Sequence, residues 1–157
     1  MKTILIQVGK TEEPFLIEGI SIYEKRIKHY LQYQSITIPA IKNAKNLSED
    51  QQKEVEADLI LKNISESDFL ILLDEQGDQF RSVEFADFMQ KKMNTGLKNL
   101  IFVIGGPYGF SKQIYSRANF KISLSKLTFS HQMIRLLFME QIYRAMTILR
   151  NEPYHHE

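Results

Sequence analysis

The chain has no cysteine among its 157 residues, which excludes disulfide bonds, thiolate metal sites and a cysteine nucleophile. It also has no run of about 18 apolar residues, the length a membrane-spanning helix needs. The apolar run near the start, residues 3–8, is too short for a signal peptide. We therefore expect a cytoplasmic protein with no membrane partner.

The chain also lacks a large excess of positive or negative charge. Twenty Lys and Arg residues against 19 Asp and Glu give a net charge of +1, so no overall field attracts nucleic acid, and we expect no DNA partner. RNA binding then requires a local basic patch or docking onto an assembled particle. One local group, Lys25, Arg26, Lys28 and His29, ends a predicted helix. It fits both pairing with the helix dipole and contact with phosphate.

Several sequence motifs of common active sites are absent. The chain has neither the phosphate-binding G-x-x-x-x-G-K-[ST] nor the dinucleotide-binding G-x-G-x-x-G. It lacks the G-x-S-x-G turn that carries a nucleophilic serine. The four histidines are scattered, so we expect no metal.

What the chain does contain is an alternation of short apolar runs with helical patterns. The runs predict strands at 3–8, 35–38, 69–73, 100–104 and 121–124. The patterns predict helices at 14–29, 49–62, 82–93, 111–118 and 132–149, with Pro14 in a first turn and caps at Ser48, Ser82 and Ser111. This order predicts one α/β domain over 1–157, with a mostly parallel sheet and helices on both faces.

The last helix, 132–149, is apolar on several sides, so it needs cover on several sides. A homodimer interface would supply that cover. Arg135 and Arg144 lie nine positions apart and fall on opposite sides of the helix, so one cleft in one chain cannot hold both. Glu140 lies one turn before Arg144 and is placed to pair with it.

Three strand ends carry unusual residues, and in a parallel sheet such ends meet at one edge, where ligands bind. They are Leu73-Asp74, Gly105-Gly106 and the loop 124–129. Glycines let a ligand approach the backbone closely. The three loops together predict a cleft, although a tight turn alone would also explain Gly105-Gly106.

Five segments, in this order and spacing, together resemble the ribosomal RNA large-subunit methyltransferase H family of SPOUT methyltransferases. They are Leu72–Glu75, Ile104–Gly109, Ser123–His131, Glu140–Ala145 and Pro153–His155. The resemblance spans essentially the whole chain. It implies S-adenosyl-L-methionine as cofactor, methylation of N3 of a pseudouridine in 23S rRNA, a homodimer and a C-terminal trefoil knot. The protein would then bind its rRNA substrate within the large subunit or the assembled ribosome.

The resemblance also implies roles for particular residues. The cofactor is expected to contact Leu73, Gly105, Gly106, Leu124, Ser125, Lys126, Leu127, Thr128 and Phe129. The acceptor base is expected to meet the catalytic group Arg144, Tyr154 and His155, with substrate contacts from His131, Arg135 and Tyr143. Tyr154 offers a ring for stacking and His155 an imidazole that can exchange a proton.

Two other functions remain open on the residues alone. One is a non-catalytic α/β dimer that binds RNA or a nucleotide on the same scaffold. The other is a small-molecule enzyme that uses the Gly105-Gly106 turn to hold phosphate. The intact loop 124–129 favours the methyltransferase, since a binding module has no need of a cofactor slot.

Overall fold

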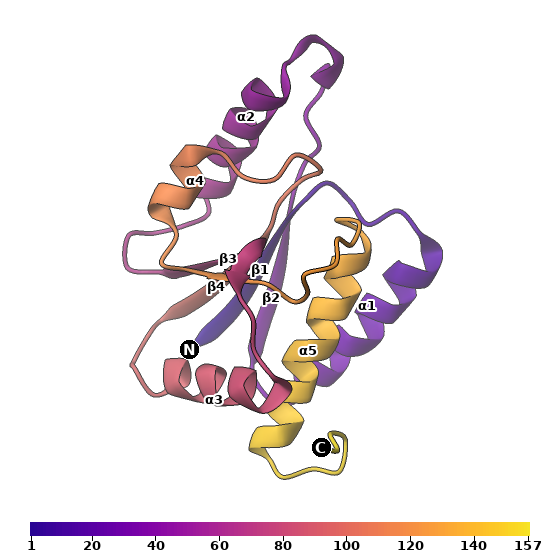
Figure 1. The fold of residues 1–157 in the computed structure, drawn as a ribbon, viewed down its shortest axis with the longest axis vertical. Coiled ribbons are helices and arrows are strands. Elements are labelled where there is room, and N and C mark those ends of the chain that lie inside the picture. The colour runs from indigo at the N-terminus through magenta and orange to yellow at the C-terminus, as the bar shows by residue number, and fades with distance from the viewer.

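The computed structural model describes all 157 residues, and its centre is one five-stranded sheet (Figure 1). Every pair of neighbouring strands is parallel, in the order β2-β1-β4-β3-β5. The strands are β1 Lys2–Val8, β2 Gln32–Ile38, β3 Phe69–Asp78, β4 Asn99–Ile104 and β5 Phe120–Ile122. Because they are parallel, their carboxyl ends share one edge of the sheet.

Helices cover both faces of this sheet (Figure 1). One face packs against α1, α3 and α5 through a cluster of 16 buried hydrophobic residues, and the other against α2 and α4 through a cluster of 12. The helices are α1 Pro14–Ile27, α2 Glu49–Leu61, α3 Ser82–Met93, α4 Lys112–Arg117 and α5 Met133–Leu149, with a short 3₁₀ helix at Ala44–Asn46. None of the helices combines the length and the apolar composition that a membrane span requires.

The predicted α/β class and the order of elements are confirmed, with local corrections. Ser48 and Ser111 cap α2 and α4 as expected. Ser82 does not cap α3: the cap position is Arg81, whose backbone N–H donates to the Glu84 carboxylate at 2.7 Å. β3 runs on to Asp78, well beyond its apolar core, and its pairing with β5 is irregular between Leu73 and Asp78, both of which pair with Ile122.

Helix α5 joins the two ends of the molecule. Its middle is fully buried at Phe138, Met139 and Ile142, and it packs between α1 and α3. Its first turn lies beside the loop that follows β5, and its last turn leads to the C-terminal tail at the opposite end (Figure 1). Residues at the first turn of α5 and residues at its last turn are therefore separated by the length of the helix.

The tail folds back on α5. Asn151 adopts a left-handed conformation with φ of 54°, and the N–H of Glu152 donates to the carbonyl of Thr147 at 3.0 Å. This is a common way to end a helix, and asparagine tolerates the conformation. The reversal returns Tyr154 and His155 to the side of α5.

Candidate active site

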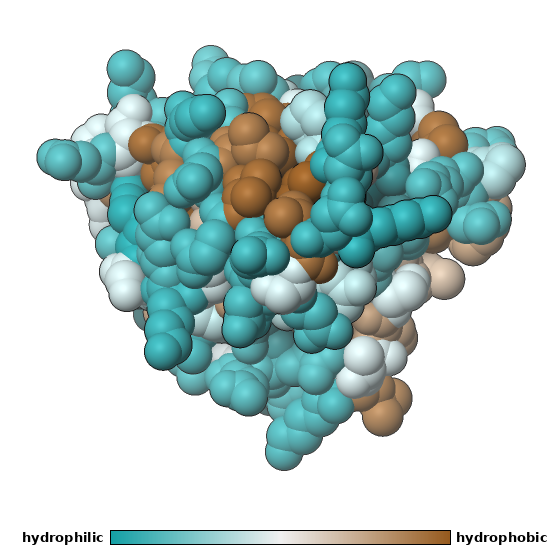
Figure 2. Space-filling view, turned by 90° about the horizontal axis from the view of Figure 1, so that it is seen from above, coloured by the Kyte–Doolittle hydropathy of each residue, from teal (hydrophilic) through white to brown (hydrophobic).

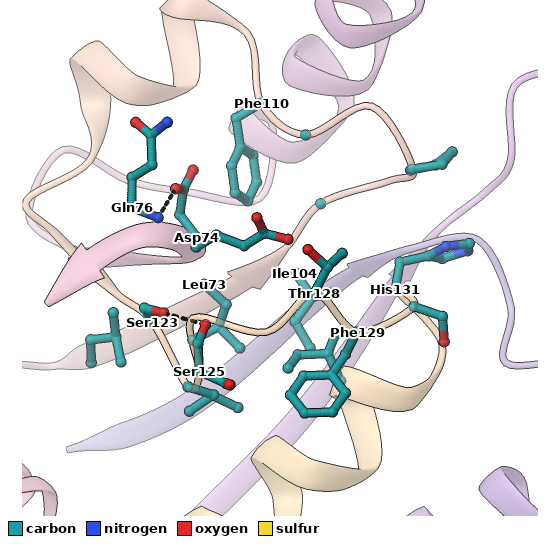
Figure 3. A pocket seen from close by; sticks show the side chains of 18 of the residues that line it. Leu73, Asp74, Gln76, Ile104, Phe110, Ser123, Ser125, Thr128, Phe129 and His131 are labelled. Atoms are coloured by element: carbon teal, nitrogen blue, oxygen red, sulfur yellow. Dashed lines mark hydrogen bonds between the residues drawn. The ribbon is translucent and has the colours of Figure 1, made fainter. Parts of the chain in front are cut away.

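A pocket of about 440 Å³ opens at the carboxyl edge of the sheet (Figure 3). Its walls are the segments after β4 and β5 and the continuation of β3 beyond Leu73, so the predicted convergence of three loops is confirmed. The volume is in the range of small-molecule sites. The lining residues are Leu73 to Gln76, Ile104 to Pro107, Gly109, Phe110, Tyr115, Ile122 to Ser125, Leu127 to His131, and Ile134.

One wall is built by side chains that hydrogen bond to each other. The Tyr115 hydroxyl donates to the Asp74 carboxylate, and Asp74 Oδ1 also accepts the N–H of Gln76 at 2.8 Å. Phe110 packs edge-on against Tyr115, with ring centroids 5.9 Å apart. Burial, followed by the bond to Asp74, raises the pKa of Tyr115, so this phenol stays protonated and holds the wall in place.

The loop after β5 is shaped by its own serines (Figure 3). Ser123 Oγ donates to the carbonyl of Ser125 at 2.9 Å, and Ser125 Oγ accepts the N–H of Leu127 at 2.9 Å. The backbone N–H groups of pocket-lining Leu124, Ser125, Thr128 and Phe129 have no partner within the protein. These unused donors could bind the polar edge of a ligand.

Lys126 is the one predicted cofactor residue that does not line the pocket. It lies between Ser125 and Leu127 at the tip of the turn that these two residues close, and it is exposed. An ammonium group is most stable in water, so the turn directs it outward. The other eight predicted cofactor residues all line the pocket.

The Gly105-Gly106 turn is closely packed from behind. A Cβ on Gly105 would lie 3.1 Å from the Phe110 ring, and a Cβ on Gly106 would lie 2.9 Å from the Glu56 carboxylate. Glu56 is 5% exposed, and burial raises the pKa of its carboxyl. A side chain at either position would therefore have to displace its neighbour, the Phe110 ring or the Glu56 carboxylate.

The expectation that Arg135 binds the substrate is corrected by its burial. The side chain is 0% exposed, and its guanidinium donates to the carbonyls of Val8 at 2.6 Å and Gly9 at 3.0 Å and to Thr11 Oγ1 at 3.0 Å. Arg135 therefore fixes the start of α5 to the loop after β1. The neighbouring Gln132 does the same, exchanging hydrogen bonds with Lys10 and Glu12.

His131, a predicted substrate contact, lies in the pocket wall, whereas Arg135 does not line the pocket. The pKa of His131 is lowered mainly by burial and also by the positive charge of Arg135. The negative charge of Glu12 acts in the opposite direction and raises it. The imidazole is thus kept neutral near neutral pH.

A second cluster lies at the other end of α5 and contains the predicted catalytic residues. Glu140 accepts from Arg144 at 2.5 Å, which confirms the predicted pair, and from the Tyr154 hydroxyl at 3.0 Å. Arg144 also donates to His155 Nδ1 at 3.3 Å and lies 4.7 Å from the Tyr154 ring centroid. Tyr143, a predicted substrate contact, packs edge-on against Tyr154 at 4.7 Å. We call these five residues the tail cluster.

The protonation of this cluster follows from its contacts. Burial, and next hydrogen bonds with Tyr23 and Glu140, raise the pKa of Tyr154, so its phenol is a donor rather than a base at neutral pH. Because a guanidinium only donates, His155 Nδ1 is an acceptor and Nε2 carries the proton. Nε2 is buried without a hydrogen-bond partner, one of three such side-chain atoms in the chain, with Thr3 Oγ1 and Arg135 Nε.

The pocket and the tail cluster do not meet within one chain. Ile134 lines the pocket, and Arg144 lies ten residues further along α5. At 1.5 Å per residue the two positions are about 15 Å apart along the helix. The structure thus brings together the predicted cofactor residues and, separately, the predicted catalytic residues.

Large apolar side chains are exposed on α1 and in the loops that form the pocket, where Leu127 and Phe129 line it. Seen from the top of Figure 1, hydrophobic side chains form a group framed by polar ones (Figure 2). The exposed large hydrophobic residues on α1 and in the pocket loops are Phe15, Ile17, Ile22, Tyr108, Leu127 and Phe129. Leu127 is 72% exposed, which is unusual for a leucine in a structured loop and is typical of a surface that another molecule covers.

Comparison with known proteins identifies the family. The family described as "Predicted SPOUT methyltransferase" matches residues 1–155. The chain belongs to this SPOUT methyltransferase family. Two relatives named "Ribosomal RNA large subunit methyltransferase H" are each 59% identical: one from Parabacteroides distasonis, over 100% of both chains, and one from Christiangramia forsetii, over 97% of both. Within the SPOUT family, the chain is therefore a member of the methyltransferase H group.

A solved structure agrees at the level of the fold. A probable methyltransferase from Bordetella pertussis Tohama I superposes with a TM-score of 0.56 at 8% identity, covering 92% of this chain and 94% of that one. So low an identity carries no information on substrate. The trefoil knot that the SPOUT resemblance implies stays a prediction.

The structure adds pocket residues that sequence reasoning missed. One wall of the pocket contains four such residues, Asp74, Gln76, Phe110 and Tyr115. The structure has no group of three or more His, Cys, Asp or Glu side chains that could hold a metal ion. Asp74 is part of the predicted cleft at its strand end, but the sequence assigns no role to it. Phe110 and Tyr115 could not be found from the sequence, because their place depends on how α4 packs.

Proposed function

We propose that this SPOUT protein transfers the methyl group of S-adenosylmethionine to a pseudouridine of large-subunit rRNA, at N3 of the base. The observation that carries the proposal is full-length identity of 59% to proteins named for ribosomal RNA methylation. The non-catalytic alternative loses its support, because these relatives are named as methyltransferases. The third alternative, phosphate held by Gly105-Gly106, rested on that turn alone.

The pocket fits the proposed cofactor. Leu73, Ile104 and Leu124 give it apolar walls suited to a flat adenine ring, and the unused N–H groups of loop 124–129 suit the polar edge of that ring. When bound, S-adenosylmethionine supplies an activated methyl group on sulfur. The protein's task is then to align the acceptor nitrogen and to help it lose its proton.

The tail cluster is suited to the acceptor. Tyr154 presents a ring on which an extruded base can stack, as single nucleotides commonly do on aromatic side chains. Arg144 stays charged, because its bond to Glu140 raises its pKa, and a fixed cation stabilises the anion left when N3 loses its proton. His155 adds an imidazole beside that cation.

We infer that the active site is completed by a second copy of the chain. Since pocket and tail cluster lie about 15 Å apart along α5, methyl donor and acceptor residues of one chain cannot meet on one base. A symmetric homodimer would place the tail cluster of one protomer against the pocket of its partner. The exposed apolar side chains around the pocket and the buried, unpartnered Nε2 of His155 support such a contact.

The function is tested by offering the enzyme and labelled cofactor three substrates side by side: naked 23S rRNA, large subunits and assembled ribosomes. We expect methyl transfer to the large subunit or the ribosome and not to naked rRNA. A net charge of +1 gives only weak electrostatic attraction to RNA alone. Mass spectrometry should find the methyl group on a pseudouridine. No transfer to any of the three, with no cofactor binding at millimolar concentration, would restore the non-catalytic alternative.

A further inference from the structure

The feature that the proposed mechanism leaves unused is the aromatic surface beside the tail cluster, contributed by α1. Tyr23 Oη lies 3.3 Å from Tyr154 Oη, and the Tyr23 and Tyr143 ring centroids are 5.8 Å apart. Exposed Arg26 lies over both rings, with Cζ 5.4 Å from the Tyr23 centroid and 5.5 Å from the Tyr143 centroid. Both distances are within the range of about 6 Å for cation–π contact.

Arg26 differs from Arg144 of the tail cluster in its charge balance. Arg144 is paired with Glu140 at 2.5 Å. Arg26 takes part in none of the five salt bridges of the chain, and its guanidinium has no hydrogen-bond acceptor. Lys28, which follows the end of α1, is paired with Glu24 at 2.6 Å. Arg26 is therefore a preoriented cation with all of its donors free.

We propose that Arg26 binds a phosphate of the rRNA backbone next to the target nucleotide. A guanidinium held against aromatic rings can keep N–H groups open to solvent, and it loses little freedom when these form a bidentate contact with phosphate. Tyr143 links the two sites, because it packs against Tyr154 at 4.7 Å and under Arg26. A nucleotide whose base stacks on Tyr154 would thus have its backbone beside Arg26. This inference rests on the proposed function and adds a residue to its acceptor site.

The test uses Arg26→Gln, Arg26→Lys and, as matched control, Lys91→Gln on α3, where the exposed ammonium is paired with Asp87. Binding to large ribosomal subunits is measured by cosedimentation over a series of salt concentrations, and methyl transfer and cofactor binding are measured in parallel. For Arg26→Gln we expect roughly five- to tenfold weaker binding and a slope of log K against log salt that is smaller by about one. The kcat and the affinity for cofactor should not change. Arg26→Lys should keep the slope, and Lys91→Gln should behave as wild type.

Two results would overturn the inference alone. One is an Arg26→Gln variant whose binding and salt slope match those of a wild-type protein that does bind and methylate. The other is a loss of kcat without a change of salt slope, which would make Arg26 a positioning residue for Tyr154. A wild-type protein that neither binds nor methylates any form of the rRNA would instead remove the proposed function, and the Arg26 site with it.

Discussion

Removal of residues 154–157 should lower methyl transfer at least about 100-fold, the scale of one well-placed acid–base group, while cofactor binding stays nearly unchanged. The deletion removes the Tyr154 ring and hydroxyl and the His155 imidazole, which surround Arg144. It leaves the pocket intact, because no residue of the tail lines it. Labelled methyl transfer to ribosomal particles gives the rate, and calorimetric titration gives the cofactor affinity.

The matched control is a shorter deletion that removes only His156 and Glu157. It breaks one exposed salt bridge, Arg81 to Glu157 at 2.9 Å, which contributes little to stability. Its activity should be that of wild type. Tyr154→Phe keeps the ring and loses the bond to Glu140, so it separates stacking from hydrogen bonding. Full activity of the longer deletion would move the acceptor site to His131 in the pocket wall.

Gly105→Val and Thr128→Arg should each abolish measurable binding of S-adenosylmethionine without unfolding the protein. A Cβ at Gly105 would already lie 3.1 Å from the Phe110 ring, so the valine methyls must displace that ring or enter the pocket. Arginine at position 128 places a long cation in a cavity of about 440 Å³ beside the site of a cationic sulfonium. Calorimetry measures the affinity, and circular dichroism checks the fold.

Lys126→Ala is the control from the same loop, because Lys126 is exposed and does not line the pocket. It should bind the cofactor as wild type does. Unchanged affinity in folded Gly105→Val and Thr128→Arg would place the cofactor elsewhere. Weaker binding by Lys126→Ala would mean that the charge of this lysine reaches the cofactor although its side chain lies outside the pocket wall.

The sequence predicted the local structure well, because local structure depends on local chemistry. Continuous apolar runs identified the buried strands, and the spacing of Ser48 and Gln51 identified a capping box that the structure contains. The loops that converge on the pocket followed from one rule, that parallel strands end at one edge. The Glu140–Arg144 pair followed from helical spacing alone.

Features that depend on distant partners could not be predicted in this way. Helical periodicity places Arg135 on one side of α5, but it does not show that the carbonyls of Val8 and Gly9 lie opposite. Nothing in β4 itself indicates that it lies between β1 and β3. The contact of Arg26 with Tyr143 joins residues 117 positions apart in the chain, from α1 and α5.

The tail gives an intermediate case. Pro153 indicated that the helix had ended, and the family resemblance indicated that Tyr154 and His155 act on the acceptor. The direction of the tail was set by Asn151, whose left-handed conformation turns the chain back toward Glu140. No pattern in the sequence distinguished that turn from an extended end.

The central claim, that one active site combines the pocket of one protomer with the tail cluster of its partner, is tested most directly by subunit complementation. Gly105→Val and the 154–157 deletion are coexpressed with different tags, and the heterodimer is purified by both. Each parent homodimer should be inactive. The account predicts about half of wild-type activity in the heterodimer, because one of its two equivalent sites joins an intact pocket to an intact tail. An inactive but folded heterodimer would show that both halves of the site must come from the same chain, and would contradict the account.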